Sequence, residues 1–285
     1  MSQTDRNPAP ASTAALHPMG PDSYLRQMGL SFRTDDGAAT GTLPFSPALW
    51  SNDGRPRLSA LGALADCVAG YRAVRDFDGA WLGTSELAVH GPFRAADADV
   101  DATAELLRRR RSGAVYEVVF HSGKSGTPLA EATVTLALLS RQGERKLPTT
   151  AGRRPSAPCR PLTTIGELVT LEEDDEAALT RLEVTDTIRN SWGVVAGGMV
   201  TLLCECEAER AATAGAGRAQ RVEGLGMHFL APGRAGPLAA RATLLSDPTA
   251  TGMRYLRVRV VDQGADGRLL ATASATVAPL TPGAH

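Results

Sequence analysis

The apolar positions of the chain follow a helical period in two segments and a period of two in the segments between them. A short apolar run at residues 41–45 precedes residues 59–71, where apolar side chains cover most of a helical circumference. Runs of alternating apolar and polar residues follow, and the last of them ends at residues 130–139. This order predicts a long buried helix packed against an antiparallel sheet of short-turn strands.

The same order recurs in the second half of the chain at an almost constant offset. The offset is 139 positions before and inside the helix and 138 to 141 positions in the strands; the matching pairs include Leu43 and Leu182, Gly54 and Gly193, Leu64 and Leu203, His90 and His228, and Tyr116 and Tyr255. Small changes of offset are typical of a duplicated unit whose loops differ in length. We therefore predict an α+β fold of two similar units, each a long central helix wrapped by its own antiparallel sheet.

Two segments lack the apolar pattern of these units. The first is rich in Ala, Pro, Ser and Thr, and the second combines arginines with prolines. We predict a disordered tail at residues 1–21, an N-terminal unit at 22–140, a linker at 141–161 and a C-terminal unit at 162–280.

Composition and charge exclude several classes of protein. Of the 285 residues, 43% are hydrophobic and 21% are charged, and the net charge is −1, which does not favour nucleic-acid binding. The sequence lacks a signal-peptide pattern and an apolar run of about 18 residues, so we expect a cytoplasmic protein that does not contact membranes. The four cysteines are too few for a disulfide framework, and Cys204 and Cys206 would point in different directions on a helix. We expect no metal site and no cofactor.

One motif in the second unit indicates chemistry. Asn190 is followed by Gly193, then by Gly197 and Gly198 at the start of the predicted helix, and then by Glu205 within it. This motif resembles that of hotdog-fold acyl-CoA thioesterases of the phenylacetate type, in which a histidine precedes the double glycine and the helix carries an acidic residue. Ala196 stands where that family has the histidine.

The first unit supplies the other half of the motif. Asp66 lies in Leu-Ala-Asp on the predicted helix, at the position equivalent to Glu205, and Thr84 opens the next strand. The resemblance implies a double hotdog with composite sites, each pairing the glycine turn of one unit with the helical acid of the other. One site then has Asp66, Thr84, Asn190, Gly197 and Gly198 as catalytic residues and is predicted to work. The other has no double glycine at residues 51–59 and pairs that turn with Glu205 and Val222, so we predict that it is degenerate.

The chemistry of such a site would be thioester hydrolysis. Backbone N–H groups at a helix start stabilise the oxyanion that develops on the carbonyl. Asp66 would act as general base on water or attack the carbonyl itself to give a mixed anhydride, and the sequence leaves both routes open. By the resemblance, Thr84 would hold the water or the carboxylate, and Asn190 would fix the glycine turn or a carbonyl. Gly193, from the motif, and Gly62 are predicted substrate contacts. Gly62 and Gly70 lie four positions to either side of Asp66 and would leave space beside it.

Each residue also has a structural interpretation. Asp66 could bond a neighbouring loop, Gly197 and Gly198 could serve packing, Asn190 could form an Asx-turn, and Glu205 could belong to a solvated helix face. The run at residues 108–111, all arginine, indicates a solvated strand edge or a phosphate-binding group.

The predicted substrate is an acyl-CoA or an acyl-carrier thioester of unknown chain, and a homodimer of such chains is a further expectation. Alternatives remain open. They are a non-catalytic acyl-CoA binder or sensor, a related acyl transfer in a specialised pathway, and a hotdog hydratase or dehydratase. The last is disfavoured because Tyr71 stands where that branch has a histidine five residues after the helical acid.

Overall fold

The computed structural model describes residues 23–35, 38–77, 80, 82–96, 98–123, 128–139, 162–190 and 192–280. The predicted tail and linker, together with Cys159, lie outside the described residues.

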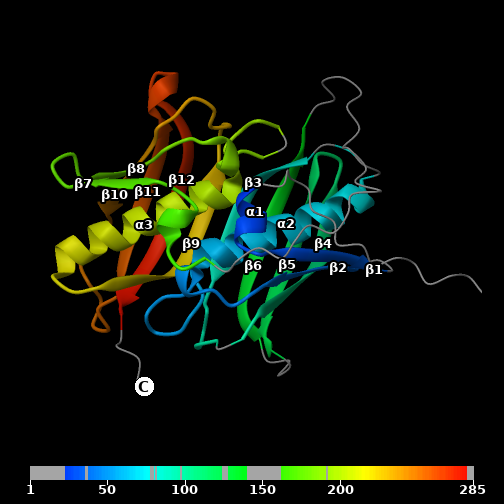
Figure 1. Cartoon of the computed structure of the whole chain (residues 1–285), viewed down its shortest axis with the longest axis horizontal. Coiled ribbons are helices and arrows are strands. Elements are labelled where there is room, and N and C mark those ends of the chain that lie inside the picture. The colour runs from blue at the N-terminus through cyan, green and yellow to red at the C-terminus, as the bar shows by residue number, and fades with distance from the viewer. Residues whose placement is uncertain are drawn as a thin grey trace, which may run out of the picture.

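The described strands form one antiparallel sheet of twelve, in the order β1-β2-β4-β5-β6-β3-β9-β12-β11-β10-β8-β7. Figure 1 shows them spanning the whole molecule. Their bounds are β1 Ser31–Asp35, β2 Ala38–Leu43, β3 Leu82–His90, β4 Val100–Arg110, β5 Gly113–Ser122, β6 Pro128–Leu138, β7 Leu171–Asp174, β8 Leu179–Leu182, β9 Gln220–Phe229, β10 Leu238–Leu244, β11 Arg254–Asp262 and β12 Arg268–Pro279.

The strand order is the same in both halves when it is followed outward from the centre. In the first half β3 is followed by β6, β5, β4, β2 and β1, and in the second half β9 is followed by β12, β11, β10, β8 and β7. The two halves meet where β3 pairs with β9, from Glu86 opposite His228 to His90 opposite Gly224. We expected a separate sheet for each helix, and the structure instead has one continuous sheet joined at this β3–β9 seam.

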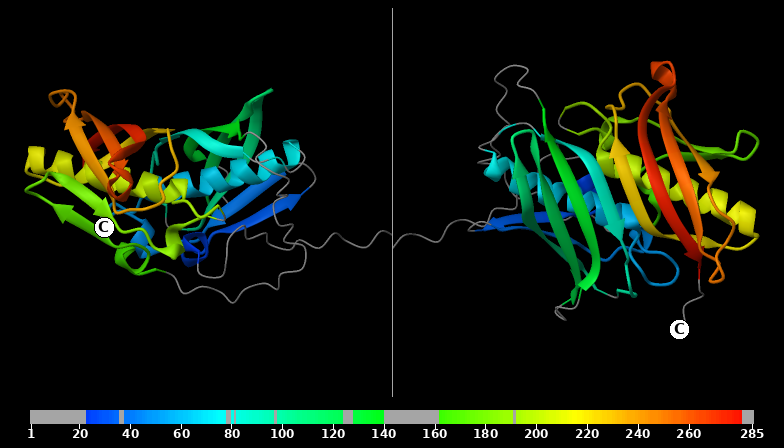
Figure 2. Two further views of the ribbon diagram at one scale, coloured as in Figure 1. Left: turned by 90° about the horizontal axis from the view of Figure 1, so that it is seen from above. Right: turned by 180° about the vertical axis from the view of Figure 1, so that it is seen from behind.

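Two long helices lie inside the curve of the sheet: α2 Leu58–Asp76 and α3 Gly197–Ala216. In Figures 1 and 2 they lie nearly end to end, with their N-terminal ends together at the middle of the molecule. Small residues allow this close approach, because a Cβ built on Gly198 would lie only 2.8 Å from Ala63 Cβ. Both helices bury most of their circumference, as their apolar pattern predicts.

The helix α2 extends beyond the predicted residues 59–71. Its last turn carries an ion pair between Arg72 Nε and Asp76 Oδ2 at 3.2 Å. The Tyr116 hydroxyl of β5 donates a hydrogen bond to the same carboxylate at 2.9 Å. Polar contacts thus extend the helix past the end of its apolar pattern.

The remaining helices are short. They are α1 Tyr24–Gln27 and the 3-10 helices η1 Pro47–Leu49, η3 Ile165–Glu167, η4 Asp186–Ile188 and η5 Gln263–Ala265. In the part of the chain that the structure describes, no helix is both long enough and apolar enough to cross a membrane.

Candidate active site

Asp66 lies near the middle of α2, half-buried, and faces the first strand after the helix. The Thr84 hydroxyl of β3 donates a hydrogen bond to Asp66 Oδ1. The register of β3 against β6 shifts between Thr84 and Glu86, and a local irregularity of this kind re-aims a strand side chain. Burial raises the pKa of Asp66 above its ordinary value, and the Thr84 hydrogen bond opposes that rise. This carboxylate is therefore a stronger base than an exposed one.

The N-terminus of α3 lies opposite this carboxylate. A Cβ built on Gly197 would lie 3.5 Å from Asp66 Oδ2 and 3.5 Å from Phe229 Cζ. The N–H groups of Met199 and Val200 both donate to the Ala196 carbonyl, whereas no acceptor among the described residues takes the N–H of Gly197 or Gly198. Unpaired N–H groups at the positive end of a helix dipole favour a negative charge. The structure thus brings Asp66 and Thr84 of the first half to Gly197 and Gly198 of the second.

Asn190 shapes the turn that precedes α3. Its Oδ1 accepts hydrogen bonds from the N–H of Trp192 at 2.9 Å and of Val194 at 3.3 Å, which is an Asx-turn pattern. Gly193 completes the turn at φ 70°, a left-handed conformation that suits glycine. The Gly193 carbonyl accepts a hydrogen bond from Arg189 Nη1 at 2.9 Å. Of the two predicted roles of Asn190, the geometry supports fixing the turn.

Gly62 is buried rather than open. A Cβ built on it would lie 3.2 Å from Leu87 Cδ2 and 3.5 Å from Thr201 Cγ2, so protein side chains fill the space expected for substrate. Around Gly70, by contrast, a built Cβ would have no atom within 4 Å. The substrate contact expected at Gly62 is therefore corrected to a packing position where α2 meets α3 and β3.

Glu205 occupies the equivalent place in the other half and makes different contacts. Its carboxylate accepts hydrogen bonds from the N–H of Leu58 at 2.9 Å and of Ser59 at 3.1 Å, and from the Ser59 hydroxyl. These are the first residues of α2, at the offset of 139 from Gly197 and Gly198. At the start of α2 the Glu205 side chain thus binds the N–H groups whose counterparts at the start of α3 have no acceptor among the described residues.

A network of charges surrounds Glu205. Arg57 Nε lies 3.4 Å from Glu205 Oε2, and Arg57 Nη2 lies 2.8 Å from Glu209 Oε2. Burial raises the pKa of Glu209 to about 7, against the lowering effect of Arg57. Glu207 is also buried, and it accepts hydrogen bonds from Thr180 Oγ1 and Arg210 Nε. Glu205 and Glu207 are 1% and 0% exposed, so the solvated helix face considered for Glu205 is wrong.

Two neighbours of Asp66 and the α3 N-terminus were not predicted from the sequence. One is Phe229, the last residue of β9, and the other is Tyr24, whose hydroxyl oxygen would lie 3.0 Å from a Cβ built on Gly198. The repeat gave no signal for Phe229, because Gly91 stands 138 positions before it. Tyr24 lies before the first predicted strand, where the sequence has no chemical motif.

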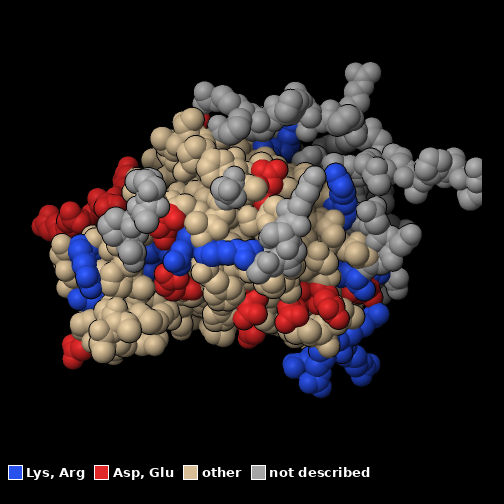
Figure 3. All heavy atoms as spheres, turned by 90° about the horizontal axis from the view of Figure 1, so that it is seen from below, with Lys and Arg blue, Asp and Glu red and all other residues tan. Residues whose placement is uncertain are grey.

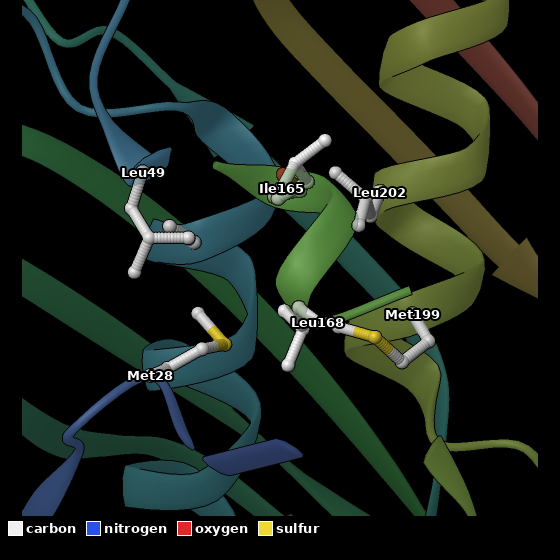
Figure 4. Close-up of a pocket in the computed structure, with 8 residues that line it drawn as sticks. Met28, Leu49, Ile165, Leu168, Met199 and Leu202 are labelled. Atoms are coloured by element: carbon white, nitrogen blue, oxygen red, sulfur yellow. The ribbon is translucent and has the colours of Figure 1, made fainter. Parts of the chain in front are cut away.

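An apolar cavity of about 10 Å³ lies beside the two helix starts. Figure 4 shows Met28, Leu49, Ile165, Leu168, Met199 and Leu202 around it. A volume of this size holds about one water molecule. An acyl chain at this place would require the surrounding side chains to move.

The arginine run at residues 108–111 had two interpretations, a solvated strand edge and a phosphate-binding group. On the face shown in Figure 3, acidic and basic side chains lie side by side over the centre, and one basic group projects at the lower right. The arginines of residues 108–110 lie exposed at the end of β4, beyond Ala104, the last residue of β4 that pairs with β2. Arg109 Cζ lies 4.6 Å from the centre of the Phe77 ring. This placement fits the solvated strand edge.

No family model matches the sequence, and no curated protein matches it significantly. Solved structures do resemble it. A hot dog fold protein from Alicyclobacillus acidocaldarius superposes with a TM-score of 0.52 at 15% identity, over 91% of this chain and 98% of the other. The chain has the hotdog fold. Two further solved structures that superpose on the chain are a protein from Thermobifida fusca assigned as a thioesterase II (TM-score 0.61, 16% identity, 90% and 98% covered) and the 12:0-ACP thioesterase of Umbellularia californica (0.58, 10%, 86% and 95%).

Proposed function

We propose that the chain is a tandem of two hotdog units, at residues 22–140 and 162–280, and that it hydrolyses a thioester at one composite site between them. The shared strand order of the two halves and the offset of about 139 residues support the tandem. Relatives of the same fold that carry thioesterase names support the reaction class.

The observation that carries the proposal is the difference between the two helix N-termini. At α3 the N–H groups of Gly197 and Gly198 have no acceptor among the described residues, and a Cβ built on Gly197 would lie 3.5 Å from Asp66 Oδ2. At α2 the equivalent N–H groups are bound by Glu205. A thioester oxygen can therefore be bound at the first position, whereas at the second it would have to displace a buried carboxylate. This supports one working site and one degenerate site in each chain.

The reaction at the first site follows from its donors and acceptors. The carbonyl oxygen of the thioester accepts hydrogen bonds from the N–H groups of Gly197 and Gly198, which strengthen as negative charge develops on it. Asp66 takes a proton from water, the water oxygen attacks the carbonyl carbon, and the C–S bond breaks. The proton passes to the leaving thiolate, so the products are a carboxylic acid and a free thiol. Thr84 holds the carboxylate in place, and Asn190 holds the turn that leads into α3.

In the second route Asp66 attacks the carbonyl carbon itself, and water then hydrolyses the mixed anhydride. A single turnover in ¹⁸O-labelled water tests for the anhydride. Label in Asp66 with an unlabelled first product indicates an anhydride that water opens at the Asp66 carbonyl. Label in the first product indicates attack of water on the acyl carbon, either in the thioester or in the anhydride.

The test of the function is free-thiol release from short, long and aromatic acyl-CoAs and from an acyl-carrier protein. We expect Asp66→Asn to lower kcat at least about 10³-fold, because the neutral amide can neither accept the proton nor attack. Glu205→Gln is the matched control, since it makes the same change at the equivalent position of the other half. Equal loss in both variants would refute the single site. Binding without turnover on any of these thioesters would favour the binder or sensor instead.

A further inference from the structure

Tyr24 of α1 places a hydroxyl group at the start of α3. Its side chain is 1% exposed. A Cβ built on Gly198 would lie 3.0 Å from Tyr24 Oη. Gly198 is the second residue of α3, and its N–H has no acceptor among the described residues.

Within the described residues the Tyr24 hydroxyl has no hydrogen-bond partner, which is unusual for a buried tyrosine. The hydroxyl of Tyr116 shows the ordinary case, since it donates to Asp76 at 2.9 Å. The fully enclosed unpaired atoms of the described part include Ser23 Oγ but not Tyr24 Oη. Tyr24 as a whole is 1% exposed, so its hydroxyl oxygen is not fully enclosed but keeps only a small accessible area.

The surroundings keep this hydroxyl protonated. Burial raises the pKa of Tyr24 well above its ordinary value, and the charges of Cys67 and Asp66 raise it further. A phenol next to a carboxylate that acts as base stays a hydrogen-bond donor at any pH at which the site works.

We propose that Tyr24 is a further substrate-binding residue of the composite site and that its hydroxyl donates to the thioester oxygen beside the N–H groups of Gly197 and Gly198. The inference rests on the proposed thioester function. Tyr24 approaches the α3 N-terminus, where the carbonyl oxygen would be held. Asp66 is itself held by Thr84 from β3. The oxyanion would then be bound by two backbone donors from the second half and one phenol from the first.

The test is Tyr24→Phe, which removes the hydroxyl and keeps the ring. We expect kcat/KM to fall about 10- to 100-fold, somewhat less than for loss of a backbone donor, with KM a few-fold higher and the melting temperature nearly unchanged. Tyr116→Phe is the matched control. It removes another partly buried hydroxyl, which contacts the end of α2, and should leave kcat/KM as in the wild type while lowering stability.

A binding measurement separates this inference from the proposed function. The probe is a ketone analogue of acyl-CoA, in which a methylene replaces the thioester sulfur so that the carbonyl oxygen remains. Tyr24→Phe should raise its Kd about 5-fold or more, whether or not the wild type hydrolyses thioesters. Wild-type values of both kcat/KM and Kd in Tyr24→Phe, with turnover lost in Asp66→Asn, would overturn the role of Tyr24 and leave the hydrolase standing. A wild type that neither hydrolyses thioesters nor binds the ketone would overturn both.

Discussion

Replacing Glu205 tests most directly the prediction that the second site is degenerate. The carboxylate is almost fully buried and caps α2 through the N–H groups of Leu58 and Ser59. It also lies 3.4 Å from Arg57 Nε. Glu205→Ala therefore leaves two helix donors unpaired and removes one partner of a partly buried arginine. Glu205→Gln keeps one acceptor oxygen but turns an amide N–H₂ toward the remaining donors.

The size of the effect follows from these contacts. Loss of an N-cap acceptor costs about 0.5–2 kcal/mol, and removing one partner of a buried ion pair costs about 3–5 kcal/mol. Arg57 keeps its contact with Glu209 at 2.8 Å, so the two effects do not add fully. We expect a loss of about 3–5 kcal/mol for Glu205→Ala and about 2 kcal/mol for Glu205→Gln. For a domain of this size, 1 kcal/mol shifts the melting temperature by about 2–4 °C, so the shifts are roughly 6–20 °C and 4–8 °C.

The assay is thermal unfolding of the full chain, followed by thiol release at a temperature where each variant is fully folded. The turnover of each folded molecule should match the wild type, because Glu205 lies outside the proposed site. A Glu205 variant that melts like the wild type but hydrolyses no thioester would refute the reasoning, since Glu205 would then act in chemistry rather than in capping.

Two further predictions concern the proposed site. Thr84→Val removes the hydrogen bond that lowers the pKa of Asp66, so the pKa of Asp66 should rise. Because the base acts only when deprotonated, the acidic limb of the pH profile of kcat/KM should move to higher pH. An unmoved limb would exclude Asp66 as the base. Gly198→Ala places a methyl group 2.8 Å from Ala63 Cβ and should destabilise the protein by about 1–3 kcal/mol in a melting experiment. In Gly197→Ala the methyl contacts begin at 3.5 Å, so stability should hold while kcat/KM falls, and a stability loss equal to that of Gly198→Ala would contradict this.

The sequence predicted the elements of the fold well because their signals are local. The helical period and the alternating strands depend on neighbours a few residues apart, and both appear where predicted in each half. The single continuous sheet was not predicted, because the β3–β9 seam joins residues such as Glu86 and His228 that lie far apart in the chain. The alternation of apolar and polar residues within a strand does not indicate which strand it pairs with.

For the candidate site, too, local motifs were predicted from the sequence and contacts between distant segments were not. Asp66, Thr84, Gly197 and Gly198 were predicted as site residues because a spaced motif and a repeat point to them, and the structure brings them close together. The role of Glu205 was not predicted, since its neighbour Ser59 lies 146 positions away in sequence. Tyr24 carries no motif, and only the packing of α1 against α3 brings its hydroxyl to Gly198. Contacts between distant segments decide which polar residues are structural and which are available to a ligand.

The β3–β9 seam also determines what each half could be on its own. Among the described residues the sheet ends at β1 and β7, two short strands of 5 and 4 residues. Separating the halves would expose β3 and β9, which have 9 and 10 residues and several buried side chains. Long unpaired edges of this kind recruit other strands. Each half therefore depends on the other for the proposed composite site and also for solubility. Separation would leave β3 in one half and β9 in the other as a long unpaired edge.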